Sequence, residues 1–285
     1  MCTSFEQLCQ SIRIRRLNKG FLKSREKAFK SAIEEHARKG QEDTANRLWV
    51  LKTIFEVQNH YLTAFNLIKK KKYYKAWCEL EHCEVSIHFL SNHYNPTDYD
   101  KYLIGYISKN VESWQSLYPY KMFISPEILE KKIRCNICGM VLSPFSRCSH
   151  KVGDLYSGKM CVREVIDLDF LGISLVENPV QKYSVPFTKD EDSGEEMDHY
   201  DYSIVQYVAE RLDNPFNNWQ PRWTKKMHDR SNFNHVPKDN KCPCSSGKLF
   251  KDCCYENESI LLPHLEVVFD EDLPVNQLQE VIITK

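Results

Sequence analysis

The sequence predicts an α+β protein, with a mainly α-helical N-terminal domain followed by two small zinc modules. Residues 5–56 contain no proline and only two glycines, and their apolar positions recur every three or four residues, which is typical of amphipathic helices. Glycines, cysteines and β-branched residues become frequent only after residue 124. Eight of the 12 cysteines fall into two groups, a spacing more typical of metal ligands than of disulfides.

The N-terminal helical domain is expected over residues 1–122. Residues 58–93 predict a helical hairpin in which four consecutive lysines, 69–72, form the polar turn. This hairpin resembles one tetratricopeptide-type unit, but no second copy follows at a fixed period, so an ordinary helical bundle is the favoured interpretation. A further helix is expected from Thr97 or Asp98, either of which can cap it, to about Tyr118.

The middle of the chain is expected to change from helices to short strands. Residues 123–186 predict a zinc-ribbon-like domain with strands at 173–176 and 183–185, where β-branched and aromatic residues gather. Residues 187–239 then predict an acidic linker, a short amphipathic helix at 200–212 and an irregular polar segment.

The C-terminal part is expected to hold a zinc knuckle at 240–256 and an acidic tail at 257–285 with a strand-like end at 281–283. The knuckle ligands are Cys242, Cys244, Cys253 and Cys254. Pro243 fixes the backbone between the first two, and residues 248–252 can form one helical turn that brings the second pair to the same ion. Four thiolates around one ion suit the tetrahedral geometry of structural zinc.

Residues 241–255 resemble the SEC-C family, whose pattern is Cys-x-Cys, eight residues, and then Cys followed by His or Cys. The match includes Pro243, the run Ser246-Gly247-Lys248 and the aromatic Phe250, whereas Ser245 stands where the family usually has glycine. The resemblance covers about a twentieth of the chain. It implies a zinc-binding terminal tag that contacts partner proteins, including a chaperone, or the ribosome.

The second group of candidate ligands begins with Cys135 and Cys138, whose spacing before a glycine is typical of zinc-ribbon knuckles. Cys148 and His150 can complete a tetrahedron, with Cys161 as the alternative fourth ligand. The segment from the first of these cysteines to the last also resembles a ribbon-like segment of bacterial and phage proteins. That resemblance favours His150 over Cys161 and implies no activity.

The sequence gives little support for catalysis. It lacks GxxxxGK[ST], GxGxxG, HExxH, GxSxG and the zinc-deaminase pattern. Both zinc groups offer four protein ligands, whereas a catalytic zinc keeps an open position. Two enzyme alternatives stay open: a Cys161 nucleophile with His150 or His199 as its base, and an activity of the N-terminal or central domain that no motif reveals.

These observations predict a cytoplasmic, non-catalytic adaptor that holds two zinc ions and binds a macromolecule, with protein as the favoured partner. No run of 18 apolar residues predicts a membrane span, and no signal pattern precedes the helical domain. The net charge is zero but unevenly spread along the chain, which gives only weak support for a nucleic-acid partner. Nucleic acid is still the alternative, because residues 219–226 interleave tryptophans that can stack on bases with cations that can meet phosphates.

The knuckle is further expected to be a separable tag, since a segment this short cannot bury a core of its own and must fold around its metal. Its exposed face would carry Lys248, Leu249, Phe250 and Lys251. In the alternative, Phe250 folds inward and the knuckle caps the chain's own domain.

Overall fold

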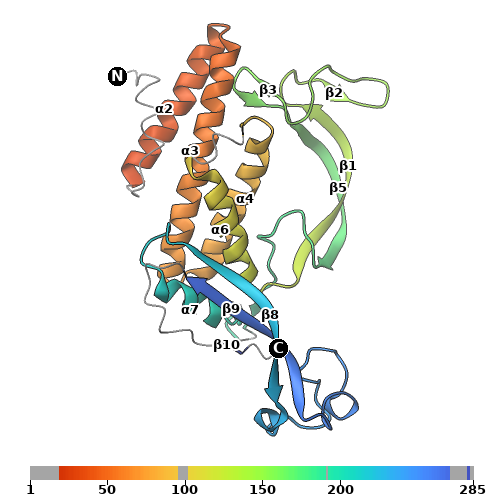
Figure 1. Ribbon diagram of the computed structural model, residues 1–285. Helices are drawn as coiled ribbons and strands as arrows, with labels where there is room; N and C mark the ends of the chain where they lie inside the picture. Colours follow the sequence, from red (N-terminus) through yellow and green to blue (C-terminus); the bar gives the residue numbers. More distant parts are fainter. Residues whose placement is uncertain (1–18, 96–101, 191, 270–280, 283–285) are drawn as a thin grey trace. The chain divides into compact units, whose positions relative to one another are not determined.

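The computed structural model describes residues 19–95, 102–190, 192–269 and 281–282 (Figure 1). Within these ranges the protein is α+β as predicted, with the helices mostly N-terminal and small sheets following them. The chain divides into two compact units, residues 1–206 and 207–285. The first unit contains the N-terminal helices together with the central cysteine group.

The helical part of the first unit consists of α2 (Lys19–Arg38), α3 (Glu42–Lys69), α4 (Tyr73–Ser91) and α6 (Ile104–Leu117). Helices α3 and α4 form the hairpin predicted around the lysine turn, while the expected cap at Thr97 or Asp98 lies outside the described residues. All four helices contribute to one apolar core, whose largest buried side chains are Phe29, Leu48, Ile54, Tyr61, Ile68, Leu80, Leu90, Ile104 and Trp114. No helix of the described ranges has the length and apolar character needed to cross a membrane.

A long antiparallel pair of strands follows the helices: β1 (Phe123–Cys135) and β5 (Arg163–Val176), named here the β1–β5 ribbon. The short strand β2 (Val141–Leu142) pairs with the last residues of β1, so the sheet order is β2-β1-β5. The sequence predicted only residues 173–176 of this ribbon. The strand expected at 183–185 is wrong: these residues form no ladder, and Ser184 contributes one carbonyl that accepts from the Ile124 N–H at 2.7 Å.

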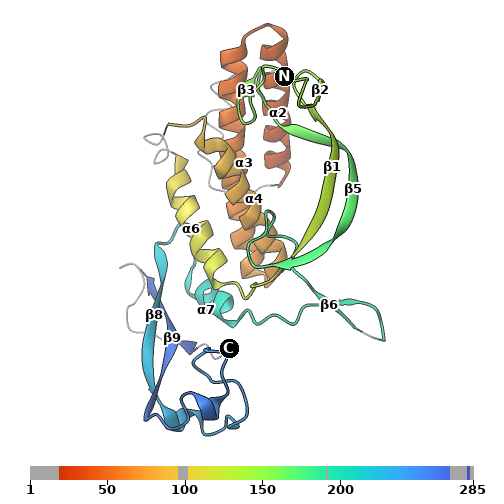
Figure 2. The same ribbon diagram turned by 90° about the vertical axis from the view of Figure 1, so that its right-hand side faces the viewer.

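The ribbon is attached to the helices at its two ends, and Figure 2 shows it arching beside them between these points. At one end the ring of Phe123 stacks on Trp77 of α4, with centroids 6.2 Å apart. The other end carries the hairpin β3 (Leu155–Tyr156) and β4 (Lys159–Met160), whose turn contacts α2 and α3. The middle of the ribbon is largely exposed.

The predicted acidic linker contains a small hairpin of β6 (Thr188–Lys189) and β7 (Glu196–Met197). The Asp190 carboxylate accepts hydrogen bonds from the backbone of Asp192 and Ser193, which explains how an acidic segment forms a defined turn. These bonds hold the pKa of Asp190 below its usual value. Helix α7 (Ser203–Arg211) follows, within the short helix expected at 200–212.

The second unit contains a sheet that the sequence did not predict. Strand β8 (Trp219–Asp229) pairs along its whole length with β9 (Ser259–Phe269), and β10 (Val281–Ile282) joins the other edge of β9. The cysteine knuckle lies between β8 and β9 in the sequence, with the short helices η2 (Arg230–Phe233) and η3 (Phe250–Asp252) on either side of its first cysteine pair. The expected irregular segment and acidic tail are therefore wrong where they overlap β8 and β9.

Candidate metal centres

The central group brings four candidate ligands together as the sequence predicted them: Cys135, Cys138, Cys148 and His150. Their ligand atoms all lie within 4.8 Å of one another. Cys135 ends β1, and the next four residues form a tight turn in which the Gly139 N–H donates to the Cys135 carbonyl at 2.8 Å. Gly139 has a φ of 72°, a conformation that costs glycine little, so the turn can place both cysteine side chains on one side.

Hydrogen bonds around Cys135 also favour the thiolate that a metal needs. Burial raises the pKa of Cys135, but hydrogen bonds from the backbone N–H groups of Cys138 and Ile137 outweigh this effect and lower that pKa to about 6. Arg163 at the start of β5 adds a positive charge, since its guanidinium donates to the Cys148 sulfur at 3.5 Å and to the His150 carbonyl at 2.9 Å. Three thiolates and one histidine around a divalent ion carry a net charge of about −1, which such a cation would offset. Sequence reasoning did not assign Arg163 this role.

Two side chains compete for the fourth place in the central group. His150 belongs to the set whose ligand atoms are all mutually close, and its buried Nδ1 has no hydrogen-bond partner among the described residues. A buried ring nitrogen without a partner is costly unless it binds something, so His150 fits a metal. Cys161 is fully buried, and its sulfur lies 3.9 Å from that of Cys135. A tetrahedral zinc with 2.3 Å bonds separates its sulfurs by about 3.8 Å, so Cys161 satisfies one such distance.

The hairpin between the candidate ligands docks the central group on the helices. Ser157 and Gly158 both have positive φ, as in a type I′ turn. The Ser157 N–H donates to the Glu42 carboxylate at 3.0 Å, and the Gly158 N–H donates to the Asn46 side chain at 2.6 Å. A Cβ added to Gly158 would lie 2.4 Å from the Ile33 side chain, so only glycine fits there. A metal that orders this loop therefore also orders its contact with α2 and α3.

The C-terminal group consists of Cys242, Cys244, Cys253 and Cys254, whose sulfurs also lie within 4.8 Å of one another. The sulfur of Cys253 is 3.5 Å from that of Cys244 and 3.6 Å from that of Cys254, close to the spacing in tetrahedral zinc–thiolate sites. Burial raises the pKa of Cys244, but hydrogen bonds, the strongest from the Ser246 hydroxyl, outweigh this effect and lower that pKa to about 6. The donors and their spacing fit one soft metal ion.

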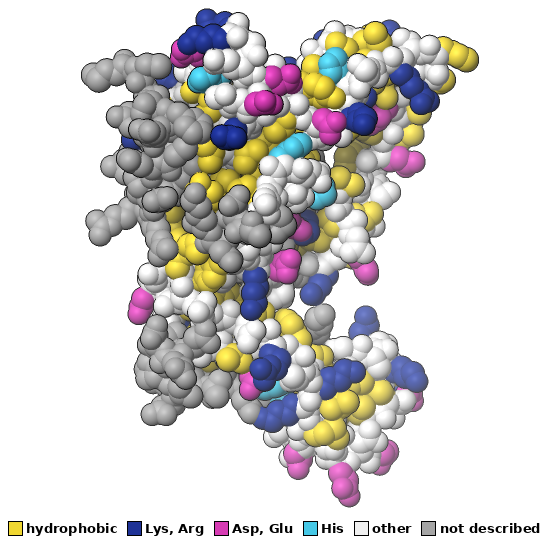
Figure 3. Space-filling view, turned by 45° about the horizontal axis from the view of Figure 1, so that its top comes forward, with side chains coloured by type: hydrophobic (Ala, Val, Ile, Leu, Met, Phe, Trp, Pro, Cys, Tyr) yellow, Lys and Arg dark blue, Asp and Glu magenta, His cyan; other side chains and the backbone are white. Residues whose placement is uncertain are grey.

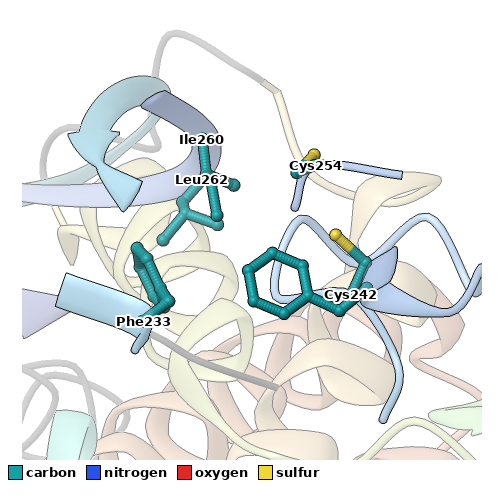
Figure 4. Close-up of a cluster of buried hydrophobic side chains, with 6 residues drawn as sticks. Phe233, Cys242, Cys254, Ile260 and Leu262 are labelled. Carbon is teal, nitrogen blue, oxygen red and sulfur yellow. The ribbon is translucent and has the colours of Figure 1, made fainter. Parts of the chain in front are cut away.

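The knuckle is part of an apolar core and does not present Phe250 to solvent. Phe250 is 1% exposed and clusters with Phe233, Ile260 and Leu262, together with two of the candidate ligands. Figure 4 shows the apolar side chains from η2 and β9 on one side of this cluster and the two cysteines on the other. The expectation of an exposed Phe250 is therefore wrong, and this side chain points inward as the alternative had it. The reason is that β9 supplies apolar partners that the short knuckle lacks.

Several cations near the C-terminal cysteines have partners within the second unit. Lys251 forms an ion pair with Asp239 at 2.6 Å, and this pair is largely exposed. Lys238 and Arg230 lie over the ring of Tyr255, at 4.2 and 4.7 Å from its centre. The rim of the knuckle is thus cationic, but part of its charge is engaged within the unit.

The enzyme alternative based on Cys161 finds little support in the geometry. The side chain is fully buried next to Cys135, where a substrate cannot reach it. A reactive cysteine is usually partly exposed and has a lowered pKa, whereas burial raises the pKa of Cys161. His150, its first candidate base, belongs to the central ligand group.

Residues 219–226, the candidate nucleic-acid segment, lie on β8. Trp223 and Lys225 are exposed and stand two residues apart, so their side chains share a face of the strand. Arg222 lies on the opposite face, and its guanidinium is 3.4 Å from the Glu266 carboxylate. The structure thus leaves one tryptophan and one lysine together on a solvent-facing strand.

Comparison with known protein families, with characterised proteins and with solved structures finds no match to this chain.

Proposed function

We propose that this protein is a cytoplasmic, non-catalytic adaptor that holds two zinc ions in structural sites and binds a partner protein through its SEC-C-like knuckle. The observation that carries the proposal is the pair of ligand groups, each with four donors within 4.8 Å of one another. Four protein ligands fill a tetrahedral zinc site and leave no position for a substrate or a reactive water. Such sites stabilise folds and do not catalyse reactions.

Zinc is the metal that suits both donor sets. Sets of four thiolates, or of three thiolates and one imidazole, are the usual ligands of structural zinc, and softer sulfur ligands disfavour magnesium and calcium. In the central site we assign His150 rather than Cys161 as the fourth ligand, because one of its ring nitrogens belongs to the mutually close group and its buried Nδ1 has no hydrogen-bond partner among the described residues. Elemental analysis of the reduced protein should find two zinc ions per chain, and one or none would remove a site from the proposal.

The partner surface we propose is the outer rim of the knuckle. With Phe250 buried, the rim consists of Leu249, which is 38% exposed, and the exposed cations Lys241, Lys248 and Lys251. A leucine among lysines suits an acidic and partly apolar patch on another protein. The SEC-C resemblance supports the same choice, since it implies a chaperone or the ribosome as the partner.

The experiment that tests this surface compares affinity-purified partners by mass spectrometry. Leu249→Ser combined with Lys248→Glu should retain both zinc ions and lose the partner, because neither side chain belongs to the buried cluster. Leu261→Ser is the matched control, since this leucine of the same unit is similarly exposed on β9. Cys253→Ser should lose one zinc and the partner together. Capture that survives the rim substitutions would refute the proposed surface.

Nucleic acid is a second candidate partner, supported by the exposed face of β8. Trp223 is 47% exposed beside Lys225, which suits stacking on an unpaired base with the neighbouring phosphate held by the lysine. Affinity for single-stranded oligonucleotides should then fall steeply with salt and drop at least tenfold in Trp223→Ala. Binding that is absent at low salt, or unchanged by this substitution, would exclude the candidate.

A further inference from the structure

The β1–β5 ribbon exposes an unusual number of large apolar side chains for a part of a folded unit. Phe170, Leu171, Ile173 and Leu175 of β5 are each more than half exposed. In Figure 3 hydrophobic side chains are interspersed with charged ones on the visible surface of the arm that β1 and β5 form. Single exposed apolar residues are ordinary, but a contiguous set of them marks an interaction surface.

The register of the ribbon separates these side chains from the charged ones. Residues paired across an antiparallel ladder share a face, and successive pairs alternate between the two faces. Apolar pairs are Ile124 with Leu175, Ile128 with Phe170, and Ile133 with Val165. Polar pairs that alternate with them are Ser125 with Ser174, Lys132 with Asp167, and Arg134 with Glu164.

Three bulges help to maintain this alternation. Each adds one residue to one strand, so that apolar side chains after the bulge stay on the same face as those before it. One face of the ribbon is therefore mainly apolar, interrupted by Glu130, and the other is polar or charged along most of its length, apart from Leu129 and the Phe123–Val176 pair at one end. The 13 residues of β1 span about 43 Å and two strands about 10 Å, which gives the apolar face an area of about 400 Å². Patches of this size are commonly functional.

The outer edge of β5 offers the backbone groups for a further strand. The outer edge of β1 is partly covered, by β2 at Ile133 and Arg134 and by the hydrogen bond from Ile124 to Ser184. Among the described residues no strand pairs with the outer edge of β5. A long unpaired edge beside an apolar face is a template for strand addition.

The charges on the ribbon decide which strand fits this edge. On the charged face β5 carries Glu164, Asp167 and Asp169. On β1, Arg134 and Lys132 lie opposite the first two, and Lys131 forms an ion pair with Asp169. The charged side chains that a strand added next to β5 would have as cross-strand neighbours on that face are all acidic. A second β5, paired antiparallel in the register that places Asp167 opposite Asp169, would bring acidic residues together, which is unfavourable.

We propose that the outer edge of β5 binds an extended segment of a partner protein in which basic and apolar residues alternate. The added strand extends the sheet, places its apolar side chains beside Phe170 and Ile173, and pairs its basic side chains with Asp167 and Asp169. This surface lies in the first compact unit, whereas the knuckle rim lies in the second, so the two proposals fail or succeed separately.

The test uses the full zinc-loaded chain and fluorescent ten-residue peptides that alternate isoleucine with lysine, or isoleucine with glutamate. The lysine peptide should bind at least tenfold more tightly than the glutamate peptide. A lysine peptide with an N-methyl group on every residue should lose this binding, because neither of its edges can donate hydrogen bonds. This comparison needs no variant of the protein. Equal binding of all three peptides, or binding of none, would overturn the proposal.

A charge reversal on β5 identifies the binding edge. Asp167→Lys with Asp169→Lys should reverse the preference to the glutamate peptide, whereas Glu195→Lys with Glu196→Lys, the same change on the exposed β6–β7 hairpin, should not. An unchanged preference in the first variant would overturn the proposal, with two bound zinc ions as the check on folding.

Two other occupants are excluded by separate measurements. Residues 12–15 of this chain, Ile-Arg-Ile-Arg, have the required alternation. If deleting residues 1–18 raises the peptide affinity tenfold or more, the chain's own segment is the occupant and the proposal is wrong. Sedimentation that shows a dimer dissolved by the lysine peptide would instead identify a second copy, and would also overturn it.

Discussion

Replacing Phe250 with alanine should destabilise the second unit by about 3–5 kcal/mol, which is the usual cost of truncating a buried phenylalanine. Phe250 is 1% exposed, lies in the cluster of Phe233, Ile260 and Leu262, and contacts the ring of Tyr255 edge-on at 5.4 Å. Small domains are stable by only about 5–15 kcal/mol in total. The variant should therefore lose a large fraction of the stability of its unit.

The same substitution should weaken metal binding, because Cys242 and Cys254 belong to the cluster that Phe250 fills. An ion that binds only the folded knuckle is linked to folding, so a loss of folding free energy reduces its apparent affinity. If folding and binding are fully coupled, the loss of about 3–5 kcal/mol in folding free energy lowers the zinc affinity by about two to four orders of magnitude, since each factor of ten corresponds to about 1.4 kcal/mol.

Leu249→Ala is the matched control for both measurements, since Leu249 precedes Phe250 and is 38% exposed. Surface truncations of this kind change stability by about 0.5 kcal/mol or less. Urea denaturation gives the stability change, hydrogen exchange of β8 and β9 assigns it to the second unit, and competition with a zinc chelator gives the affinity. If the two alanine variants behave alike, Phe250 does not hold the unit together and the packing argument fails.

Three further substitutions test other parts of the first unit. His150→Ala should lower the zinc content by one ion per chain while Cys161→Ala leaves it unchanged, and elemental analysis showing the reverse would assign Cys161 as the ligand. Gly158→Ala should destabilise the protein by about 1–3 kcal/mol in thermal denaturation because its Cβ would clash with α2, and more than Gly153→Ala, whose Cβ meets open space. Burial raises the pKa of Glu81, so the ionised carboxylate opposes folding. Glu81→Gln should therefore raise the free energy of unfolding at pH 7, and this gain should disappear as the pH falls below 4.5, the ordinary pKa of glutamate. A gain that does not depend on pH would contradict this prediction.

The sequence predicted the members of both ligand groups because their spacing is local. Cys135 and Cys138 lie on one turn, as do Cys253 and Cys254, so pattern alone brings each pair to one place. Pattern favoured His150 over Cys161 without excluding the latter, because both enter the site from the loop that precedes β5 and their positions depend on how this loop docks on α3. Gly158, which permits the docking, was visible only as one glycine among nine.

The sheets were poorly predicted because their partners are far apart in the sequence. Strand β8 pairs with β9 about 40 residues later, and its exposed side includes Lys225 and Trp223, so it looked like a polar irregular segment. Without β9 nothing in the knuckle could bury Phe250, and the sequence therefore assigned it to the surface. Only Ile173–Val176 of the β1–β5 ribbon was predicted, because Glu127, Glu130, Lys131 and other charged residues interrupt its apolar positions.

The different burial of the two ligand groups predicts that they lose zinc at different rates. Cys138 of the central group is exposed, so a chelator can contact a ligand directly. In the C-terminal group Cys242 and Cys254 are buried in the apolar cluster, and release of the ion requires that cluster to open. Excess chelator should therefore remove the zinc in a fast phase followed by a slow one. The slow phase should vanish in Cys242→Ser, which has no C-terminal ion, and should accelerate in Phe250→Ala, which loosens the cluster. A slow phase that persists in Cys242→Ser but is lost in Cys138→Ser would reverse the assignment and show that docking on α2 and α3, not the apolar cluster, protects the more stable ion.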